Sequence, residues 1–160
     1  MYSAKVIVPK TVLNNPQALT RAVENALSGA ALDVKVDFEV TTQTWDERPP
    51  FTIASEPGKR TIGTTDAVYQ YVDAGTRPHT IAPINAKALA FPANYAAKTT
   101  PHVIASQPGG KSGKMVFRQE VHHPGSKARE FSQTIGEKWK AELPAILQRS
   151  IDAEVARQQA

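Results

Sequence analysis

The chain contains no cysteine and no long apolar run. Without cysteine there can be no disulfide, no thiolate nucleophile and no thiolate metal ligand. No apolar run approaches the roughly 20 residues that a transmembrane helix needs. The N-terminal segment MYSAKVIVPK also lacks the charged and then apolar order of a secretory signal. We therefore expect a soluble protein that is made and folded in the cytoplasm.

Short motifs of the common enzyme classes are also missing. The sequence has no HExxH zinc motif and no GxSxG elbow, and the segment QPGGKSG lacks the GxxxxGK spacing of a phosphate loop. No carboxylate lies at a ligand spacing near the histidines, and the adjacent His122 and His123 would point to opposite faces of a strand. We expect no catalytic residue, no metal and no cofactor. Together with His79 and His102, these histidines are the only support for the alternative of a small hydrolase.

Positive charge is concentrated in one stretch of the chain. The net charge is +4 at pH 7, and the excess falls between residues 98 and 129, where Glu120 is the only acidic residue. The basic residues there are Lys98, Lys111, Lys114, Arg118, Lys127 and Arg129. We interpret them as candidate contacts for nucleic-acid phosphates or for an acidic protein, and the alternative is a solvated loop.

The N-terminal part of the chain predicts one helix and one strand. Asn15 and Pro16 are typical of a helix start, and Ser28 with Gly29 is typical of a helix end. Residues 33–40, DVKVDFEV, alternate apolar and charged side chains, which predicts a strand with one wet face. Such a strand favours an antiparallel sheet that is covered by helices on its other side.

Prolines and glycines divide the next part of the chain into short pieces. Residues 46–60 include three prolines and a glycine and predict an irregular surface loop. Residues 59–64 then predict a strand. Thr65 and Asp66 predict the start of one or two helical turns, which end at Gly75.

Two hairpins are predicted beyond these helical turns. The first joins residues 79–83 to residues 87–91, and a proline closes the second of these segments. The second hairpin joins residues 102–105 to residues 115–118 across QPGGKSG, whose glycines suit a turn. Much of residues 93–114 is therefore expected to be an extended loop insertion.

The last element is the longest, a helix over about residues 127–158. Apolar side chains recur every four residues along it, at Phe131, Ile135, Trp139, Leu143, Leu147, Ile151 and Val155. This spacing overshoots a helical turn by about 40° per step, so the whole stripe turns by about 240° around the axis. Pro144 is expected to kink or break the helix.

A stripe that turns so far cannot all face one core, so the two halves of this helix are expected to have different neighbours. We predict that the side chains before Pro144 pack on the sheet, namely Phe131, Ile135 and Trp139. We predict that the side chains after it contact another subunit, namely Leu147, Ile151 and Val155.

Together these elements predict an α+β protein with one domain over residues 1–160. A small antiparallel sheet packs against an N-terminal helix and against a long C-terminal helix, which is kinked or broken near Pro144. Extended loops cover residues 46–60 and 93–114. A length of 160 residues is usual for one domain, and a hydrophobic content of 41% suffices for a core.

Two segments carry a resemblance to a known family. They are YQYVDAGTRPHTIAPINAKALAF at residues 69–91 and VHHPGSKAREF at residues 121–131. In this order, before a C-terminal helix, they resemble tail-completion or head–tail joining proteins of long, non-contractile-tailed bacteriophages of the siphovirus type.

Members of that family typically carry a tyrosine-rich turn, an acidic residue before Gly-Thr, a Pro-His hairpin that ends in Leu-x-Phe, and His-Pro-Gly-x-Lys before a Phe-containing helix. The matching residues here are Tyr69, Tyr71, Val72, Asp73, Gly75, Thr76, Pro78, His79, Ile81, Pro83, Lys87, Leu89, Phe91, His123, Pro124, Gly125, Lys127 and Phe131.

The chain departs from the family pattern in two places. Asp73 stands where glutamate is commoner, which shortens the reach of the carboxylate and keeps its charge. The connection from Phe91 to His123 is longer than the family pattern leads us to expect. It contains most of the basic residues, so no family detail is carried over to residues 98–114.

The resemblance implies a structural protein of the virion and not an enzyme. Several copies, as a ring of six, are expected at the neck or the upper end of the tail. The implied partners are identical copies and other neck, tail-terminator or tail-tube proteins, with no membrane. The alternative is a protein of the DNA exit channel that contacts phosphate without reading the base sequence.

The motif residues then have structural roles. We expect Asp73 to accept hydrogen bonds from the backbone of Thr76 and Arg77, or to pair with Arg77. We expect His79 and His123 to brace adjacent loops by hydrogen bonding.

Overall fold

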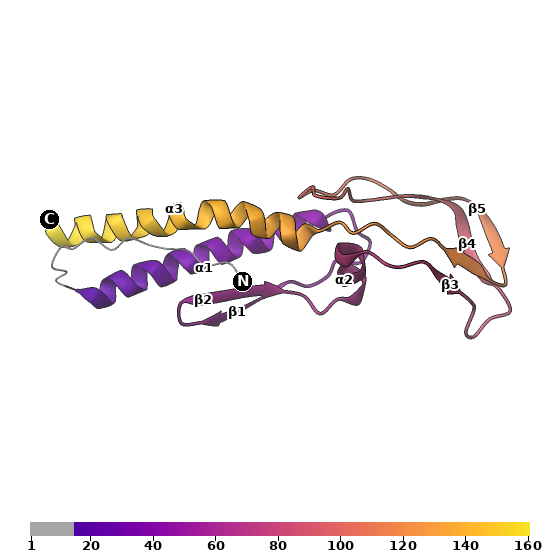
Figure 1. The fold of residues 1–160 in the computed structure, drawn as a ribbon, viewed down its shortest axis with the longest axis horizontal. Helices are drawn as coiled ribbons and strands as arrows, with labels where there is room; N and C mark the ends of the chain where they lie inside the picture. Colours follow the sequence, from indigo (N-terminus) through magenta and orange to yellow (C-terminus); the bar gives the residue numbers. More distant parts are fainter. Residues whose placement is uncertain (1–14) are drawn as a thin grey trace. The chain divides into compact units, whose positions relative to one another are not determined.

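The computed structural model describes residues 15–160, and within them it contains three helices and three two-stranded antiparallel sheets (Figure 1). This confirms the predicted α+β class with an N-terminal helix and a long C-terminal helix, although the strands form three small sheets instead of one. No helix in the described range is long and apolar enough to cross a membrane. The described chain divides into two compact units, one of residues 15–38, 51–64 and 133–160 and one of residues 39–50 and 65–132.

Helix α1, Pro16–Thr41, begins where the sequence predicts. The Asn15 Oδ1 accepts a hydrogen bond from the backbone N–H of Ala18 at 3.0 Å, which satisfies one of the unpaired donors at the helix start. The helix continues past Gly29, so the predicted strand at residues 33–40 is wrong. Apolar residues of that segment also lie four apart, and this spacing buries one helical face as well as alternation would bury one strand face.

Strands β1, Thr52–Glu56, and β2, Lys59–Gly63, form a hairpin in the first unit. The strand predicted at residues 59–64 is confirmed as β2, whereas the irregular loop predicted over residues 46–60 is wrong where β1 lies. The turn is formed by Pro57 and Gly58, and Gly58 adopts a φ of 69°, which glycine reaches without steric cost.

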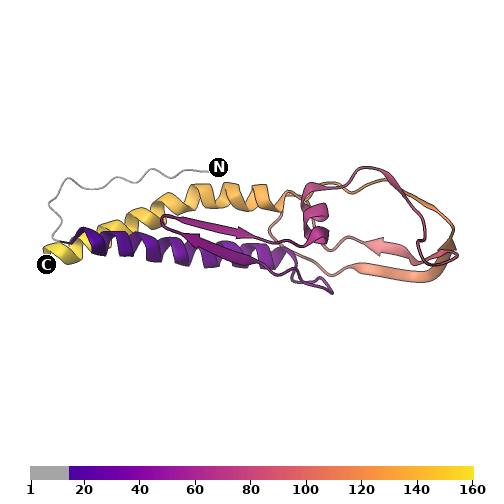
Figure 2. The same cartoon turned by 90° about the horizontal axis from the view of Figure 1, so that it is seen from below.

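One ion pair holds this hairpin to α1. The Arg60 Nη2 lies 2.7 Å from the Glu24 Oε2, and the Gly58 N–H donates to the Glu24 Oε1 at 2.6 Å. The pKa of Glu24 is lowered from its ordinary value by the Gly58 N–H and then by Arg60. Figure 2 shows the hairpin running along α1.

Helix α3, Phe131–Gln159, runs through Pro144 without a break. It begins at Phe131 and not near residue 127. Its apolar stripe is buried along almost its whole length, at Phe131, Ile135, Trp139, Leu147, Ile151 and Val155.

The stripe is buried because α1 accompanies α3 along its length (Figures 1 and 2). The Trp139 Nε1 donates to the Asp37 Oδ2 at 2.7 Å, and further along the Ser150 Oγ donates to the Ala22 carbonyl at 2.9 Å. Near the C-terminus the Gln158 side chain bonds both the backbone N–H and the carbonyl of Asn15.

Two predictions about α3 are therefore wrong. In place of the predicted packing of Phe131, Ile135 and Trp139 on the sheet, Trp139 bonds to Asp37 of α1, and Phe131 stacks on Tyr69, which lies in a helix. Leu147, Ile151 and Val155 are buried within the chain, with exposed fractions of 5%, 2% and 8%, so they are not held in reserve for another subunit. Two long helices that pack side by side can wind around each other. One helix, here α1, can then cover an apolar stripe that turns around the axis of the other, here α3.

The second unit contains α2, Ala67–Ala74, and four strands. Asp66 caps α2 by accepting the Tyr69 N–H at 2.7 Å, and Gly75 ends the helix with a φ of 74°, as the sequence predicts. Strand β3, His79–Ile81, pairs with β6, Val121–His123, and β4, Leu89–Ala96, pairs with β5, Gly110–Arg118.

Neither predicted hairpin of this region forms. β3 pairs with the distant β6 and not with residues 87–91, while residues 102–105 form no strand and β5 pairs with β4. β4 also continues beyond Pro92, because the register shifts between Pro92 and Asn94. A bulge at this point accommodates a residue that has no N–H to donate. The insertion predicted at residues 93–114 is therefore in part a strand ladder.

Candidate functional site

The two family-like segments, residues 69–91 and 121–131, lie side by side in the second unit, although residues 92–120 separate them along the chain. The register of β3 and β6 pairs His79 with His123 and Thr80 with His122. Beyond the strands, the backbones of Thr76 and Ser126 exchange two hydrogen bonds, at 3.0 Å and 3.1 Å. We call residues 72–81 with residues 121–132 the joint.

Asp73 fixes the start of α3 at one end of the joint. Its carboxylate accepts from the Ser132 Oγ at 2.6 Å and from the Ser132 N–H at 3.1 Å. Its main-chain carbonyl accepts from the N–H groups of Arg129 and Glu130 at 3.1 Å and 3.0 Å. The carboxylate thus satisfies an unpaired donor at a helix N-terminus, where negative charge is favoured. We expected Asp73 to bond with Thr76 and Arg77, but the hydrogen bonds of Asp73 go to Ser132, Arg129 and Glu130 instead.

Two glycines let the segments of the joint approach each other closely. Gly125 has a φ of 84°, and a Cβ built on it would clash with the carbonyl oxygen of Thr76. Gly75 has a φ of 74°, and its Cβ would lie 2.7 Å from the Ser126 carbonyl oxygen and from the Ala128 nitrogen. Real Cβ atoms do not come so close to backbone, so both positions require glycine.

Histidines brace the joint, as the sequence predicts. The His79 Nδ1 lies 2.9 Å from the Arg77 carbonyl oxygen, and the His123 Nδ1 accepts the Gly125 N–H at 3.0 Å. The two rings face each other across β3 and β6, with centroids 5.1 Å apart.

The other two histidines lie outside this contact. His122 is exposed and its Nε2 lies 3.3 Å from the Glu120 Oε1, while the His102 Nδ1 lies 3.3 Å from the Glu130 Oε2. Among residues 15–160 no group of three or more histidine, aspartate and glutamate side chains is placed to hold a metal ion.

Buried aromatic residues pack together at the joint. Tyr69 and Phe131 are almost fully buried and stack with centroids 6.0 Å apart, and Trp45 lies 6.2 Å from the Tyr69 ring. Burial raises the pKa of Tyr69, and the charge of Asp73 raises it further, while a hydrogen bond with Thr41 acts in the opposite direction. The hydroxyl of Tyr69 therefore stays protonated, and the side chain contributes to packing.

Not every family-like residue belongs to the joint. Tyr71 is 63% exposed on α2. Leu89 and Phe91 lie on β4, opposite Arg118 and Val116 of β5. Pro78 and Pro124 lie within the two segments that form the joint. Ser132 is central to the geometry, and nothing in the sequence indicates it beyond its position at the start of a helix.

The predicted basic residues are divided among different roles. The Lys98 Nζ pairs with the Asp46 Oδ1 at 2.9 Å, and the Arg129 Nε donates to the buried Thr99 hydroxyl at 3.1 Å. These two residues therefore hold the unit together. Lys111, Lys114, Arg118 and Lys127 are exposed.

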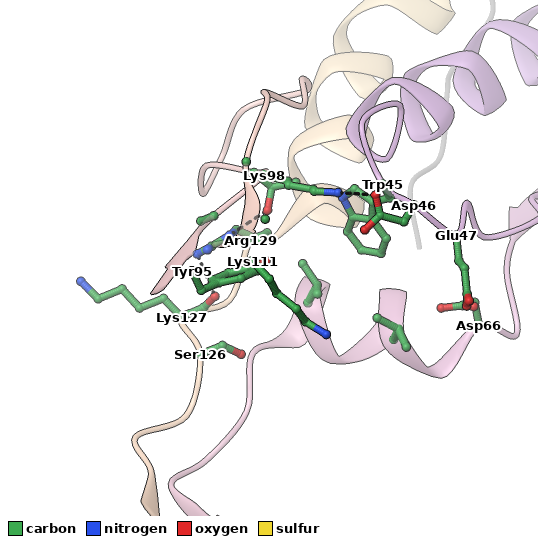
Figure 3. A pocket seen from close by; sticks show the side chains of 16 residues that line it. Trp45, Asp46, Glu47, Asp66, Tyr95, Lys98, Lys111, Ser126, Lys127 and Arg129 are labelled. Carbon is green, nitrogen blue, oxygen red and sulfur yellow. Dashed lines mark hydrogen bonds and ion pairs between the residues drawn. The ribbon is translucent and has the colours of Figure 1, made fainter. Parts of the chain in front are cut away.

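Four of the basic residues line a cavity of about 700 Å³ in the second unit (Figure 3). They are Lys98, Lys111, Lys127 and Arg129. Three carboxylates line the same cavity, from Asp46, Glu47 and Asp66, together with Trp45 and Tyr95. Lys127 points away from the other labelled side chains, and Lys98 is directed at Asp46. Because both signs of charge are present, the cavity is not a simple anion site.

Comparisons of this chain with protein-family models, with curated proteins and with solved structures found no match.

Proposed function

We propose that this chain is a structural virion protein of a tailed bacteriophage. It acts as a tail-completion or head–tail connector subunit, and its copies form a ring at the neck or the upper end of the tail. Its partners are identical copies and the adjoining neck, tail-terminator or tail-tube proteins. The resemblance of residues 69–91 and 121–131 to that family is the source of the proposal.

The joint is the observation that carries the proposal furthest. The two resembling segments are distant in sequence, yet they meet in the short β3–β6 ladder and in a separate bridge between Thr76 and Ser126, with the glycines Gly75 and Gly125 at the close approach. The polar groups of Asp73, His79 and His123 are engaged with neighbouring backbone or with Ser132. These polar atoms are already bonded within the chain, so they are not available to react with a substrate. We infer that the three residues have a structural role.

The small sheets of the second unit support an assembled state. A two-stranded ladder alone is marginally stable in water, and both β3–β6 and β4–β5 have only two strands. Three large side chains of β4 and β5 are more than half exposed, namely Tyr95, Met115 and Phe117. Surface of this kind is typical of a subunit that contacts other proteins.

Localisation in phage particles tests the proposal. An antibody raised against the purified chain should label the junction between head and tail in electron micrographs of particles that encode it. Particles made without the protein should accumulate as separate heads and tails, and adding the purified chain should restore joining. Label on the capsid or tail tip, or normal particles in its absence, would contradict the proposal.

Contact with DNA is the second candidate function, and the exposed cations favour it. Strand β5 contains Lys111, Lys114 and Arg118 but no acidic residue, and none of these cations has a carboxylate partner among the described residues. A filter-binding titration with duplex DNA should then give an affinity that falls steeply with salt, since phosphate contacts release counterions. Absence of binding at low salt would remove this candidate.

A further inference from the structure

The positive charge of the β4–β5 ladder lies on one face. Directly opposed residues of an antiparallel ladder share a face, and residues two apart along a strand lie on the same side. Tyr95 is paired with Lys111, on the face that also carries Leu89 and its partner Arg118. Lys114 lies on this face as well, four residues before Arg118. We call Tyr95, Lys111, Lys114 and Arg118 the basic face.

The β-bulge brings Lys111 to this side of the ladder. Lys111 and Phe117 are an even number of residues apart along β5, so a regular strand would place both on the side that is opposite Arg118. The register shift between Pro92 and Asn94 adds one residue to β5, which turns Lys111 to the side of Tyr95. The other side of the ladder, with Met115 and Phe117, contains no charged residue.

The basic face suits a chain of negative charges. The two strands contain three cations and no acidic residue, and the three side chains are exposed. None of them has a carboxylate partner within residues 15–160. Lys111 and Arg118 are seven residues apart, so a polyanion along β5 would meet cations over roughly 20 Å.

An exposed aromatic ring stands among these cations. Tyr95 is 69% exposed, and Lys111 is its direct neighbour across the ladder (Figure 3). Exposed aromatic rings within a basic groove are the surfaces on which proteins stack unpaired bases. In a duplex the bases are stacked on each other, so a base must leave the stack before it can use such a ring. The pairing of Tyr95 with Lys111 therefore favours a single strand over a duplex.

The mixed-charge cavity lies on the same face. Tyr95 and Lys111 line this cavity of about 700 Å³, together with Lys127 from the segment after β6. Glu47 and Asp66 lie together on the side away from Lys127 (Figure 3). Carboxylate oxygens accept hydrogen bonds from the exocyclic amino groups of bases. The cavity thus offers cations for a phosphate and carboxylates for the edge of a base.

We propose that the basic face and this cavity bind single-stranded nucleic acid, with the sugar-phosphate backbone along β5 and one base stacked on Tyr95. This inference rests on the second candidate function, contact with DNA, and narrows it from duplex to unpaired strands. Phosphate contacts position the strand without reading its sequence, and the stacked ring selects an unpaired base. A nucleotide carries both an anion and amino donors, which accounts for the two signs of charge in the cavity.

Fluorescence anisotropy with the full chain tests the proposal. The labelled probes are oligo(dC), oligo(rC) and a duplex, each of about 20 nucleotides per strand, at about 50 mM salt. Single strands should bind at least about tenfold more tightly than the duplex, which corresponds to about 1.4 kcal/mol. The tighter of oligo(dC) and oligo(rC) identifies DNA or RNA as the ligand.

Variants separate stacking from phosphate contact. Tyr95→Ala should weaken single-strand binding about tenfold, whereas Tyr95→Phe keeps the ring and should bind as the wild type does. Tyr71→Ala is the matched control, because it removes a tyrosine that is 63% exposed on α2, and it should change nothing. Lys114→Gln should weaken the binding of single strand and duplex alike and reduce the salt slope by about one. Circular dichroism checks that each variant folds.

A second measurement needs no variant. Trp45 lines the cavity, so unlabelled oligo(dC) should quench tryptophan fluorescence as a base enters. Oligo(dT) should bind more weakly, because thymine has no amino group to donate to Glu47 and Asp66.

Several results would overturn the inference. Equal affinity for single strand and duplex, or unchanged single-strand affinity in folded Tyr95→Ala, would leave contact with duplex DNA as the candidate. Equal affinity for oligo(dC) and oligo(dT) would overturn the role of the two carboxylates. Absence of binding to every probe at low salt would remove the inference together with the second candidate, whereas labelling of phage particles tests the virion role separately.

Discussion

Replacing Asp73 by alanine tests how the joint is held. The substitution removes the acceptor for the Ser132 N–H and for the Ser132 hydroxyl, at 3.1 Å and 2.6 Å. Loss of a helix N-cap costs about 1 kcal/mol, and loss of a negative charge near the N-terminus of α3 adds about 0.3 to 1 kcal/mol. Asp73 is only half-buried, so the sum is kept to about 1 to 2 kcal/mol.

For a chain of this length, 1 kcal/mol corresponds to a fall in Tm of roughly 2–4 °C. Thermal unfolding followed by circular dichroism should therefore show a fall of several degrees for Asp73→Ala. Asp73→Asn keeps an acceptor and should lose about half as much. Glu142→Ala, at an exposed position within the same helix, controls for the loss of a carboxylate and should stay within about 0.5 kcal/mol of the wild type.

The reasoning would be refuted if Asp73→Ala unfolded at the same temperature as Glu142→Ala. It would also be refuted if the alanine and asparagine variants were equally destabilised, because the hydrogen bonds to Ser132 would then contribute nothing. Oligomer formation by Asp73→Ala should weaken together with stability, and normal assembly would mean that the joint is not needed for ring formation.

Three further predictions follow from the described contacts. Gly125→Ala should destabilise the chain by about 2 kcal/mol or more in urea unfolding, since its Cβ meets a backbone carbonyl at positive φ; an unchanged midpoint would contradict the joint. Glu24→Gln should reduce the acid dependence of stability. The folded pKa of Glu24 is lowered by Gly58 and Arg60, so its contribution is present above the ordinary glutamate pKa and is lost as pH falls through the lowered value; parallel pH profiles for both proteins would contradict this. Pro144→Ala should raise the free energy of unfolding, measured by urea unfolding, by up to about 3 kcal/mol, because α3 is continuous there; a loss of stability would show that the proline is needed.

Local signals in the sequence predicted the start of α1 and both ends of α2. Asn15 at the start of α1, and Asp66 and Gly75 at the two ends of α2, act through their own side chains or their own φ. Such effects depend on the adjacent few residues only, so the sequence contains all that is needed.

Alternation misled the prediction at residues 33–40. The segment DVKVDFEV places apolar residues two apart and also four apart, so the same side chains suit a strand face and a helix face. The preceding helix decides between them, because continuing α1 past Gly29 costs only about 1 kcal/mol and keeps its buried face on α3. The pattern of residues 33–40 alone contains no information about the helix that precedes it.

Pairing between distant segments could not be predicted from the sequence. Nothing near His79 indicates that its strand partner is His123, and nothing near Asp73 indicates Ser132. The resemblance placed these residues in two linked motifs without showing that they touch. The fate of Leu147, Ile151 and Val155 was missed for the same reason, since the pattern defines a stripe and does not say which element covers it.

Native mass spectrometry of the purified chain, with averaged electron micrographs of the same sample, tests the central claim most directly. The account predicts one closed ring of identical subunits with cyclic symmetry, of six copies as the family resemblance implies. A solitary monomer at all concentrations, with no ring in the micrographs, would contradict it.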